Sequence, residues 1–280
     1  MDGTPNEPQT AQEKHAALAR RLRALRRVVV AYSGGVDSSF LASVAHDTLG
    51  ADALAVTAVS PSLARRELDA ATRLAAERGW NHRIVGTHEV AREEYARNDG
   101  DRCYWCKTEL FEVLGPVAEE LDAQMVVGTN VDDLGDYRPG LIAADEKNVM
   151  APLVDARLTK SEIRALSDDA GLPTADKPAS PCLASRFAYG VRVTPEGLRR
   201  IDAAEEFVRS LGFEIFRVRD HGDLARLEVP KDQIGRAVSL GETIDEGLKE
   251  LGYRYVSIDL KGFRSGSLNE ALLTPAFGPQ

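Results

Sequence analysis

Two groups of residues in this sequence have the types and spacing that chemistry requires: a glycine- and serine-rich heptad and three cysteines. The heptad reads Ser33-Gly34-Gly35-Val36-Asp37-Ser38-Ser39. Glycine lets a ligand approach the main chain, and successive N–H groups at the start of a helix form an anion site that the helix dipole strengthens. The heptad therefore predicts a phosphate or pyrophosphate site. A glycine turn capped by serine is the alternative.

The cysteines are Cys103 and Cys106, in a C-x-x-C pair, and Cys182, in a loop punctuated by prolines. They fit three interpretations: buried free thiols, a redox dithiol, or ligands of a zinc ion or an iron–sulfur cluster. Zinc usually takes four protein ligands, whereas a four-iron cluster held by three thiolates leaves one iron open to a substrate atom. None of the five histidines stands at a recognisable catalytic spacing.

Composition narrows the class of protein. The chain has 280 residues, of which 43% are hydrophobic, and a net charge of −9. Its length favours one large or two ordinary domains with a sizeable core. The negative charge argues against a broad nucleic-acid surface, although it permits a local cationic pocket. The polar start and the lack of an apolar run near about 20 residues predict a cytoplasmic protein with reduced thiols and no membrane span.

Strands alternate with helices in the first part of the chain. We predict strands at 28–32, 53–59, 82–85 and 124–127, and helices at 11–26, after the heptad, at 63–78, 108–122 and 159–170. This alternation predicts an α/β fold with a doubly wound parallel sheet, whose ligands lie beyond the carboxyl ends of the strands. The loops 33–39, 60–62 and 128–140 follow such ends. Residues 88–109 give no clear pattern, and 145–157 predict a loop with a short strand.

The pattern changes near residue 193. We predict helices at 194–211, 230–240 and 242–251, and strands at 214–219, 225–229 and 254–259. These elements indicate a small α+β domain with an antiparallel sheet. The predicted organisation is a disordered N-terminus at 1–14, an α/β domain that contains the heptad at 15–190, and a small α+β domain at 191–280.

The heptad lacks the lysine of a Walker loop and the three glycines of a dinucleotide fold, and it resembles the loop of the PP-loop ATP pyrophosphatases. Four further stretches carry a narrower resemblance: 102–107, 128–140, 177–187 and 262–268. Together they are similar to the LarE family of ATP-dependent sulfur transferases, which help to build the nickel-pincer nucleotide cofactor of lactate racemase. The resemblance covers about residues 15–270.

This resemblance implies a reaction and its cofactors. ATP, assisted by Mg²⁺, adenylates one carboxylate of pyridinium-3,5-biscarboxylic acid mononucleotide, and pyrophosphate leaves. A sulfur nucleophile then displaces AMP to give a thiocarboxylate. Adenylation is needed because a carboxylate is a poor electrophile, and the N–H groups of the loop stabilise the charge on the departing pyrophosphate. The family also implies a homo-oligomer, up to a hexamer, while the sulfur donor stays unidentified.

The source of the transferred sulfur divides the family. One type sacrifices the cysteine at the position of Cys182, and the other holds a [4Fe-4S] cluster on three cysteines. The presence of Cys103 and Cys106 beside Cys182 favours the cluster type. Two further functions compete: a PP-loop tRNA thiolase, which would need a basic RNA surface, and a nucleotide sensor without chemistry, in which the cysteines have no purpose.

The resemblance also implies roles for individual residues. Asp37 lies in the metal–pyrophosphate region, while Asp132 and Asp136 order their loop. Arg217 and Arg219 alternate along a strand and so project to one face, where the arginine fork suits a phosphate. The ATP and pyrophosphate group comprises the heptad Ser33–Ser39, Ser60, Gly128, Thr129 and Arg138. The substrate-phosphate group comprises Arg217, Arg219, Glu228, Arg186 and Arg264.

Overall fold

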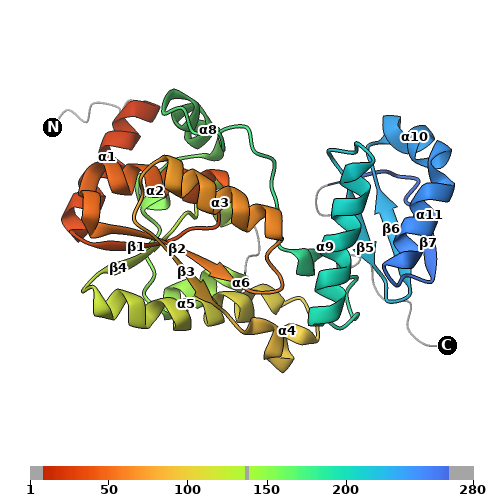
Figure 1. Ribbon diagram of the computed structural model, residues 1–280. Coiled ribbons are helices and arrows are strands. Elements are labelled where there is room, and N and C mark those ends of the chain that lie inside the picture. The colour runs from red at the N-terminus through yellow and green to blue at the C-terminus, as the bar shows by residue number, and fades with distance from the viewer. Residues whose placement is uncertain (1–8, 136–138, 265–280) are drawn as a thin grey trace. The chain divides into compact units, whose positions relative to one another are not determined.

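The computed structural model describes residues 9–135 and 139–264, and the chain folds into two compact units (Figure 1). The first unit takes residues up to 59, 65–87 and 104–180, and the second takes 60–64, 88–103 and the residues from 181 onward. The chain therefore passes into the second unit at Pro181, earlier than the predicted boundary after residue 190. The reason is that 181–190 hydrogen-bonds to other segments of the second unit, as with Leu183 N–H to Ser62 O at 2.8 Å.

The first unit is built on a four-stranded parallel sheet. Its strands, in the spatial order β3-β2-β1-β4, are β1 (Val28–Ala31), β2 (Ala53–Val59), β3 (His82–Gly86) and β4 (Gln124–Val127). The chain winds outward from β1 to β3 and then returns to the other side of β1. A doubly wound sheet binds ligands where the winding direction reverses, which here is at the carboxyl ends of β1 and β4.

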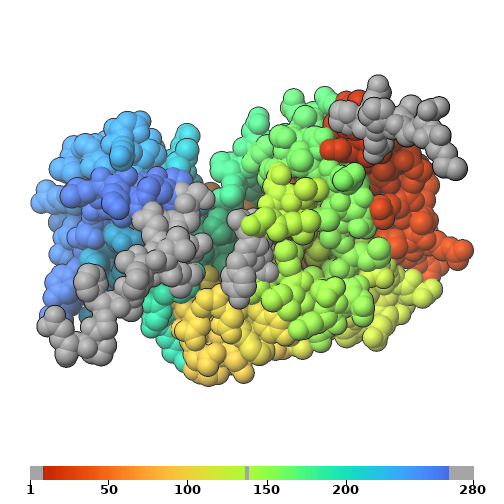
Figure 2. Space-filling view, turned by 180° about the vertical axis from the view of Figure 1, so that it is seen from behind, coloured from red at the N-terminus to blue at the C-terminus, as the bar shows by residue number. Residues whose placement is uncertain are grey.

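Strand β1 is central because it is apolar on both faces. Val28 and Val30 face one core with helices α1, α2, α3 and α8, whereas Val29 faces another core with α5. All three valines are fully buried, as expected for a central strand of a covered parallel sheet. Seen from behind, yellow-green atoms of the α5–α6 region cover much of this unit (Figure 2).

Seven helices accompany this sheet among the described residues. They are α1 (Ala11–Leu25), α2 (Val36–Leu49), α3 (Arg65–Glu77), α5 (Arg102–Glu120), α6 (Pro139–Glu146), α7 (Pro152–Asp155) and α8 (Lys160–Asp169). The prediction that 11–14 is disordered is wrong, because these residues form the first turn of α1. A capping box between Thr10 and Glu13 stabilises that turn. A second capping box, of Thr159 with Glu162, begins α8 as predicted.

Two other predictions for this region are corrected. Residues 145–157 contain the end of α6 and all of α7 rather than a strand, and a single bridge joins Met150 to Val126. Helix α5 begins at Arg102, six residues before the predicted start, so Cys103 and Cys106 lie one helical turn apart on the same element. The boundary between the two units falls within its first turn.

The second unit packs helices against a three-stranded sheet. Its elements are η2 (Glu89–Ala91), α4 (Glu93–Ala96), η4 (Leu183–Arg186), α9 (Pro195–Ser210), β5 (Arg217–Asp220), β6 (Leu224–Glu228), α10 (Ile234–Ser239), α11 (Gly241–Glu250) and β7 (Tyr255–Ile258). The sheet is mixed rather than antiparallel, because β7 pairs with β6 in parallel. The crossover through α10 and α11 makes this pairing possible. In the described parts of the chain, no helix is long and apolar enough to span a membrane.

Two histidine side chains of the first unit, His46 and His82, interact with each other. The Thr57 hydroxyl donates to Tyr32 O, so the His82 Nε2–H must donate to Thr57 Oγ1, at 2.9 Å. His46 accepts the Asn81 N–H at its Nε2 and donates from its Nδ1 to Ala42 O. His46 thus carries its proton on Nδ1, and His82 carries one on Nε2. Burial and the neighbouring His46 lower the pKa of His82 below its ordinary value.

We expect this lowered pKa to make the free energy of unfolding depend on pH. A depressed histidine pKa contributes stability that is complete above the unfolded pKa of about 6.5 and is lost as the pH falls through the folded pKa. The wild-type protein should therefore lose more stability between pH 7.5 and pH 5 than His82→Gln, which keeps an N–H donor for Thr57. Urea unfolding at both pH values measures the difference, and equal losses in the two proteins would contradict the prediction.

Candidate functional site

The heptad follows β1 at the switch point of the sheet, and its last four residues, 36–39, form the first turn of α2. Gly34 has a φ of +70°, and a Cβ on it would lie 2.8 Å from the Cβ of Ala71. Gly35 caps α2 without a side chain, so the N–H groups of the first helical turn point outward with no acceptor within the helix. Ser33 Oγ and Ser38 Oγ hydrogen-bond at 3.0 Å and brace the turn. The Val36 side chain packs into the core.

The loop after β4 reaches the same place, and Gly128 is the residue that lets it do so. A Cβ on Gly128 would lie 2.8 Å from the Ser38 backbone nitrogen and 3.0 Å from the Asp37 carbonyl carbon. Both contacts are with main chain, which cannot move aside as a flexible side chain could. Thr129 and Asn130 follow, and the Asn130 amide donates to Asp37 Oδ1 at 3.2 Å. Gly128 thus joins the site for a steric reason.

The start of α8 also lies at this end of the sheet and carries a lysine. Lys160, the first residue of α8, places its ammonium on the carboxylate of Asp37, and its backbone N–H donates to Asp132 Oδ2 at 2.7 Å. Asp132 thus joins its loop to the start of α8. Asp37 is partly exposed and stands between two helix N-termini and a lysine. A carboxylate beside clustered donors suits a metal-bound pyrophosphate. The sequence analysis did not single out Lys160, although the helix predicted at 159–170 places this residue in its first turn.

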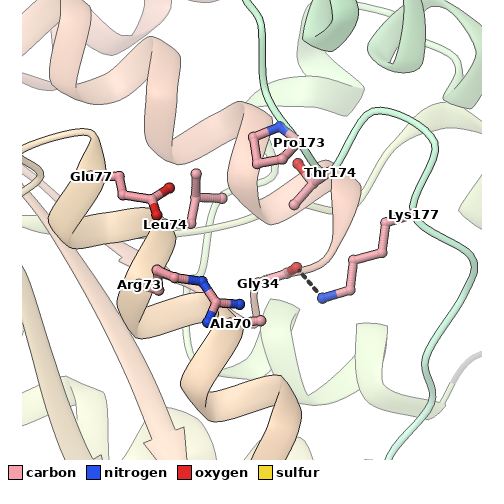
Figure 3. A pocket seen from close by; sticks show the side chains of 8 residues that line it. All are labelled: Gly34, Ala70, Arg73, Leu74, Glu77, Pro173, Thr174 and Lys177. Atoms are coloured by element: carbon pink, nitrogen blue, oxygen red, sulfur yellow. Dashed lines mark hydrogen bonds between the residues drawn. The ribbon is translucent and has the colours of Figure 1, made fainter.

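Lys177 holds the other side of the heptad. Its ammonium donates to Gly34 O at 2.8 Å (Figure 3). The same ammonium pairs with Glu67 Oε2 at 2.7 Å. Burial by itself would raise the pKa of Glu67, but hydrogen bonds from Lys177 and Ser180 lower it below its ordinary value. A cavity of about 280 Å³ opens beside this contact. Its lining comprises Gly34, Ala70, Arg73, Leu74, Glu77, Pro173, Thr174 and Lys177.

We expect Lys160→Met to impair ATP-dependent pyrophosphate release by about a hundredfold, since one preorganised charged donor at a developing charge contributes that much. Lys160→Arg should restore part of the loss, because it returns a cation to the same helix start. Lys147→Met is the matched control, because Lys147 belongs to the same unit but pairs with Glu112 on the surface. Pyrophosphate release in Lys160→Met at the wild-type rate would exclude a role for this lysine.

The cysteines lie on two segments. Cys103 is exposed and Cys106 half-buried on the first turns of α5, and Cys182 is half-buried just before η4. In the second unit, Arg102 lies close to both Cys103 and Cys182: burial alone would lower the pKa of Arg102, but the two sulfurs raise it. In the part of the chain that the structure describes, no three cysteine, histidine, aspartate or glutamate side chains form a group that could hold a metal ion.

Three arginines of the second unit hold the main chain around Cys182. Arg186 donates to Cys182 O at 3.2 Å, Arg102 to Ala184 O at 2.9 Å, and Arg219 to Ser185 O at 3.1 Å. Hydrogen bonds from the loop itself and from two other segments thus hold the backbone around Cys182.

The predicted substrate-phosphate residues take part in this network. Arg186 is 2% exposed and forms two hydrogen bonds of 2.9 Å with the buried Glu205. Arg219 bonds to the buried Glu228 at 3.0 Å. Arg217 lies opposite Glu228 in the sheet register, with its guanidinium over the ring of Phe263. Arg264 donates to Gly262 O. The strand face is therefore rich in arginine, and its binding of a phosphate stays a prediction.

Two other predicted site residues are not among the described residues of the first unit. Ser60 follows β2 but belongs to the second unit, where its hydroxyl and that of Ser62 donate to the buried carboxylate of Glu89. Arg138 and Asp136 lie outside the described residues. The motif at 262–268 is described up to Arg264.

A parallel sheet in the order β3-β2-β1-β4, with a glycine–serine loop opening α2, defines a PP-loop nucleotide-binding domain. Residues 12–107 match the asparagine synthase family, which is of this class. The chain is 38% identical over 265 residues to pyridinium-3,5-bisthiocarboxylic acid mononucleotide synthase of Lactiplantibacillus plantarum, covering 94% of this chain and 96% of that protein. It is 47% identical over 252 residues to an uncharacterized protein of Synechocystis, covering 89% and 94%.

An uncharacterized protein of Methanocaldococcus jannaschii is 30% identical over 241 residues, which cover 86% of this chain and 92% of that protein. The similarity therefore extends through both units. The chain belongs to the LarE family and is an ATP-dependent sulfurtransferase of the PP-loop class.

Proposed function

We propose that this enzyme converts pyridinium-3,5-biscarboxylic acid mononucleotide into the bis-thiocarboxylate, one carboxylate at a time. The observation that carries the proposal is the similarity to the Lactiplantibacillus synthase over 94% of the chain. The arrangement in the first unit supports the activation step. There, the start of α2 and Lys160 offer N–H groups and a cation to the phosphates of ATP, and Asp37 offers a carboxylate to Mg²⁺.

The first step is attack of a substrate carboxylate oxygen on the α-phosphorus of ATP. A bond forms between that oxygen and phosphorus, and pyrophosphate leaves with the bonding electrons. The donors of the heptad stabilise the charge on the leaving group, because helix N-termini and backbone N–H groups favour anions. Gly34 and Gly128 keep the donors in place, since each makes a main-chain approach that a side chain would block.

In the second step a sulfur nucleophile attacks the acyl carbon, and AMP leaves. Cys182 is the residue that we assign to sulfur delivery, because its loop is the one whose backbone three arginines hold. The presence of three cysteines supports a [4Fe-4S] cluster on Cys103, Cys106 and Cys182. Sacrifice of the Cys182 sulfur is the alternative route.

One experiment tests the function and separates the two routes. The protein is purified without oxygen, its iron, sulfide and visible spectrum are measured, and its intact mass is taken after turnover with ATP, Mg²⁺ and the pyridinium substrate. Cluster iron with an unchanged chain mass supports the cluster route. Loss of H₂S from an iron-free chain supports sacrifice and a dehydroalanine at position 182. Absence of any thiolated product would overturn the proposed function.

A further inference from the structure

Two segments of the second unit run side by side in opposite directions. The first holds residues 96–102 and leads into Cys103, and the second holds residues 184–193 and follows Cys182. The hydrogen bonds between them come in antiparallel order. They join Arg102 to Ala184 O, Asn98 to Ala188 O and Val191 O, and Val193 N–H to Ala96 O. The Cys103 and Cys182 ends of the two segments therefore meet at Arg102.

Asn98 and Arg102 take part in these hydrogen bonds through their side chains. Asn98 is fully buried with a φ of +63°, a conformation that asparagine tolerates better than most residues. Its amide nitrogen donates to Ala188 O at 2.8 Å and Val191 O at 3.0 Å, so its Oδ1 must be the atom that accepts from Arg102. One Nη1 of Arg102 thus serves both Asn98 Oδ1 and Ala184 O.

We propose that Arg102 is a positioning residue: by tying Ala184 to the start of α5, it sets the separation between the sulfurs of Cys103 and Cys182. Arg102 adjoins Cys103 in the chain, and its hydrogen bond fixes the carbonyl two residues after Cys182. Arg102 is 8% exposed, so loss of its guanidinium would leave two buried acceptors without their donor. The effect of Arg102 on catalysis rests on the proposed sulfur transfer, whereas its effect on the distance between the two sulfurs does not.

The spacing is measured with dibromobimane, which becomes fluorescent when it bridges two thiols. The parent is the metal-free Cys106→Ser protein, so that a bridge can join Cys103 to Cys182 alone, as mass spectrometry of the linked peptides verifies. We expect bridging in the parent and a rate lower by about tenfold or more in the Arg102→Met variant, since small misplacements cost reactions of this kind that much. Arg102→Lys keeps the buried charge but loses the planar fork and should be slowed as well.

Arg192→Met is the matched control, because Arg192 lies in the same unit and pairs with Glu93 on the surface. It should bridge at the parent rate. The inference is overturned if the parent yields no linked peptide, or if a folded Arg102→Lys or Arg102→Met variant bridges as fast as the parent. Circular dichroism establishes folding, and Arg102→Lys keeps the test valid if Arg102→Met does not fold.

A second readout links the spacing to the reaction. In otherwise wild-type protein, Arg102→Lys should lower the yield of thiolated product by about tenfold while ATP-dependent pyrophosphate release stays unchanged, because the activation site belongs to other residues. An equal fall in both would contradict a positioning role. The bridging assay uses neither ATP nor the pyridinium substrate. If the enzyme does not thiolate that substrate, the proposed function is overturned, but the result on the spacing of the two sulfurs still stands.

Discussion

Cys182→Ser should abolish thiocarboxylate formation while pyrophosphate release from ATP continues within about threefold of the wild-type rate. The two steps separate because the groups that we propose for activating the carboxylate lie in the first unit, around the heptad and Lys160, whereas Cys182 is the residue that we propose for sulfur delivery. Serine keeps the size of the side chain but removes the sulfur, so adenylation proceeds and the adenylate is left to water. Removing a nucleophile typically costs several powers of ten in rate. Product analysis by mass spectrometry, beside a pyrophosphate assay, measures both steps.

Cys103→Ser distinguishes the two sulfur sources in the same assay. If Cys182 is sacrificed, Cys103→Ser should still give one thiolation per chain, because Cys182 alone would suffice. If three thiolates hold a cluster, Cys103→Ser should lose thiolation together with bound iron. A Cys182→Ser protein that still forms the thiocarboxylate would exclude this cysteine from sulfur delivery under either route.

Gly128→Ala should damage ATP activation although it adds a single methyl group. The new Cβ would lie 2.8 Å from the Ser38 nitrogen and 3.0 Å from the Asp37 carbonyl carbon, so the first turn of α2 or the loop after β4 must shift. Overpacking of this kind costs about 1–3 kcal/mol in stability, and a shift of about 1 Å at a reacting centre costs about a hundredfold in rate. Pyrophosphate release and the thermal midpoint of unfolding are the measurements.

Gly135→Ala is the control for this prediction. Gly135 lies in the same connection after β4, but within the described residues no atom beyond its chain neighbours would lie within 4 Å of a Cβ added there. The substitution should leave pyrophosphate release and the thermal midpoint close to those of the wild-type protein. Equal effects of the two substitutions, or normal activity in Gly128→Ala, would show that the close approach of Gly128 does not shape the ATP site.

The central part of the first unit could be predicted from sequence because its signals are local. Strands β2 and β4 agree with their predictions to the residue, since each is an apolar run with a helix on either side. The heptad follows β1 and leads into α2 as expected. The pairing of β7 was missed because strand direction depends on the crossover through α10 and α11, which strand periodicity does not record.

The missed site residues share one property: their partners are distant in the chain. Lys160 meets Asp37 across 123 residues, and Arg102 meets Ala184 across 82. An arginine or lysine beside a predicted helix start is common, so its type and position alone do not single it out. The buried arginines Arg186 and Arg219 were predicted to bind a phosphate, and that role stays a prediction. The structure shows Arg186 and Arg219 bonded to carboxylates and to the Cys182 loop.

The strand order has a consequence for how the enzyme becomes active during folding. β1 pairs with β2 at a separation of 25 residues, Val28 to Ala53, but with β4 at 96, Val28 to Gln124. Closing the longer loop costs more chain entropy, and distant pairings form slowly. The heptad side of the nucleotide site should therefore assemble before Gly128 arrives. In refolding, recovery of helical signal should precede recovery of ATP binding, so a newly made chain passes through a folded-looking state that cannot yet hold its nucleotide.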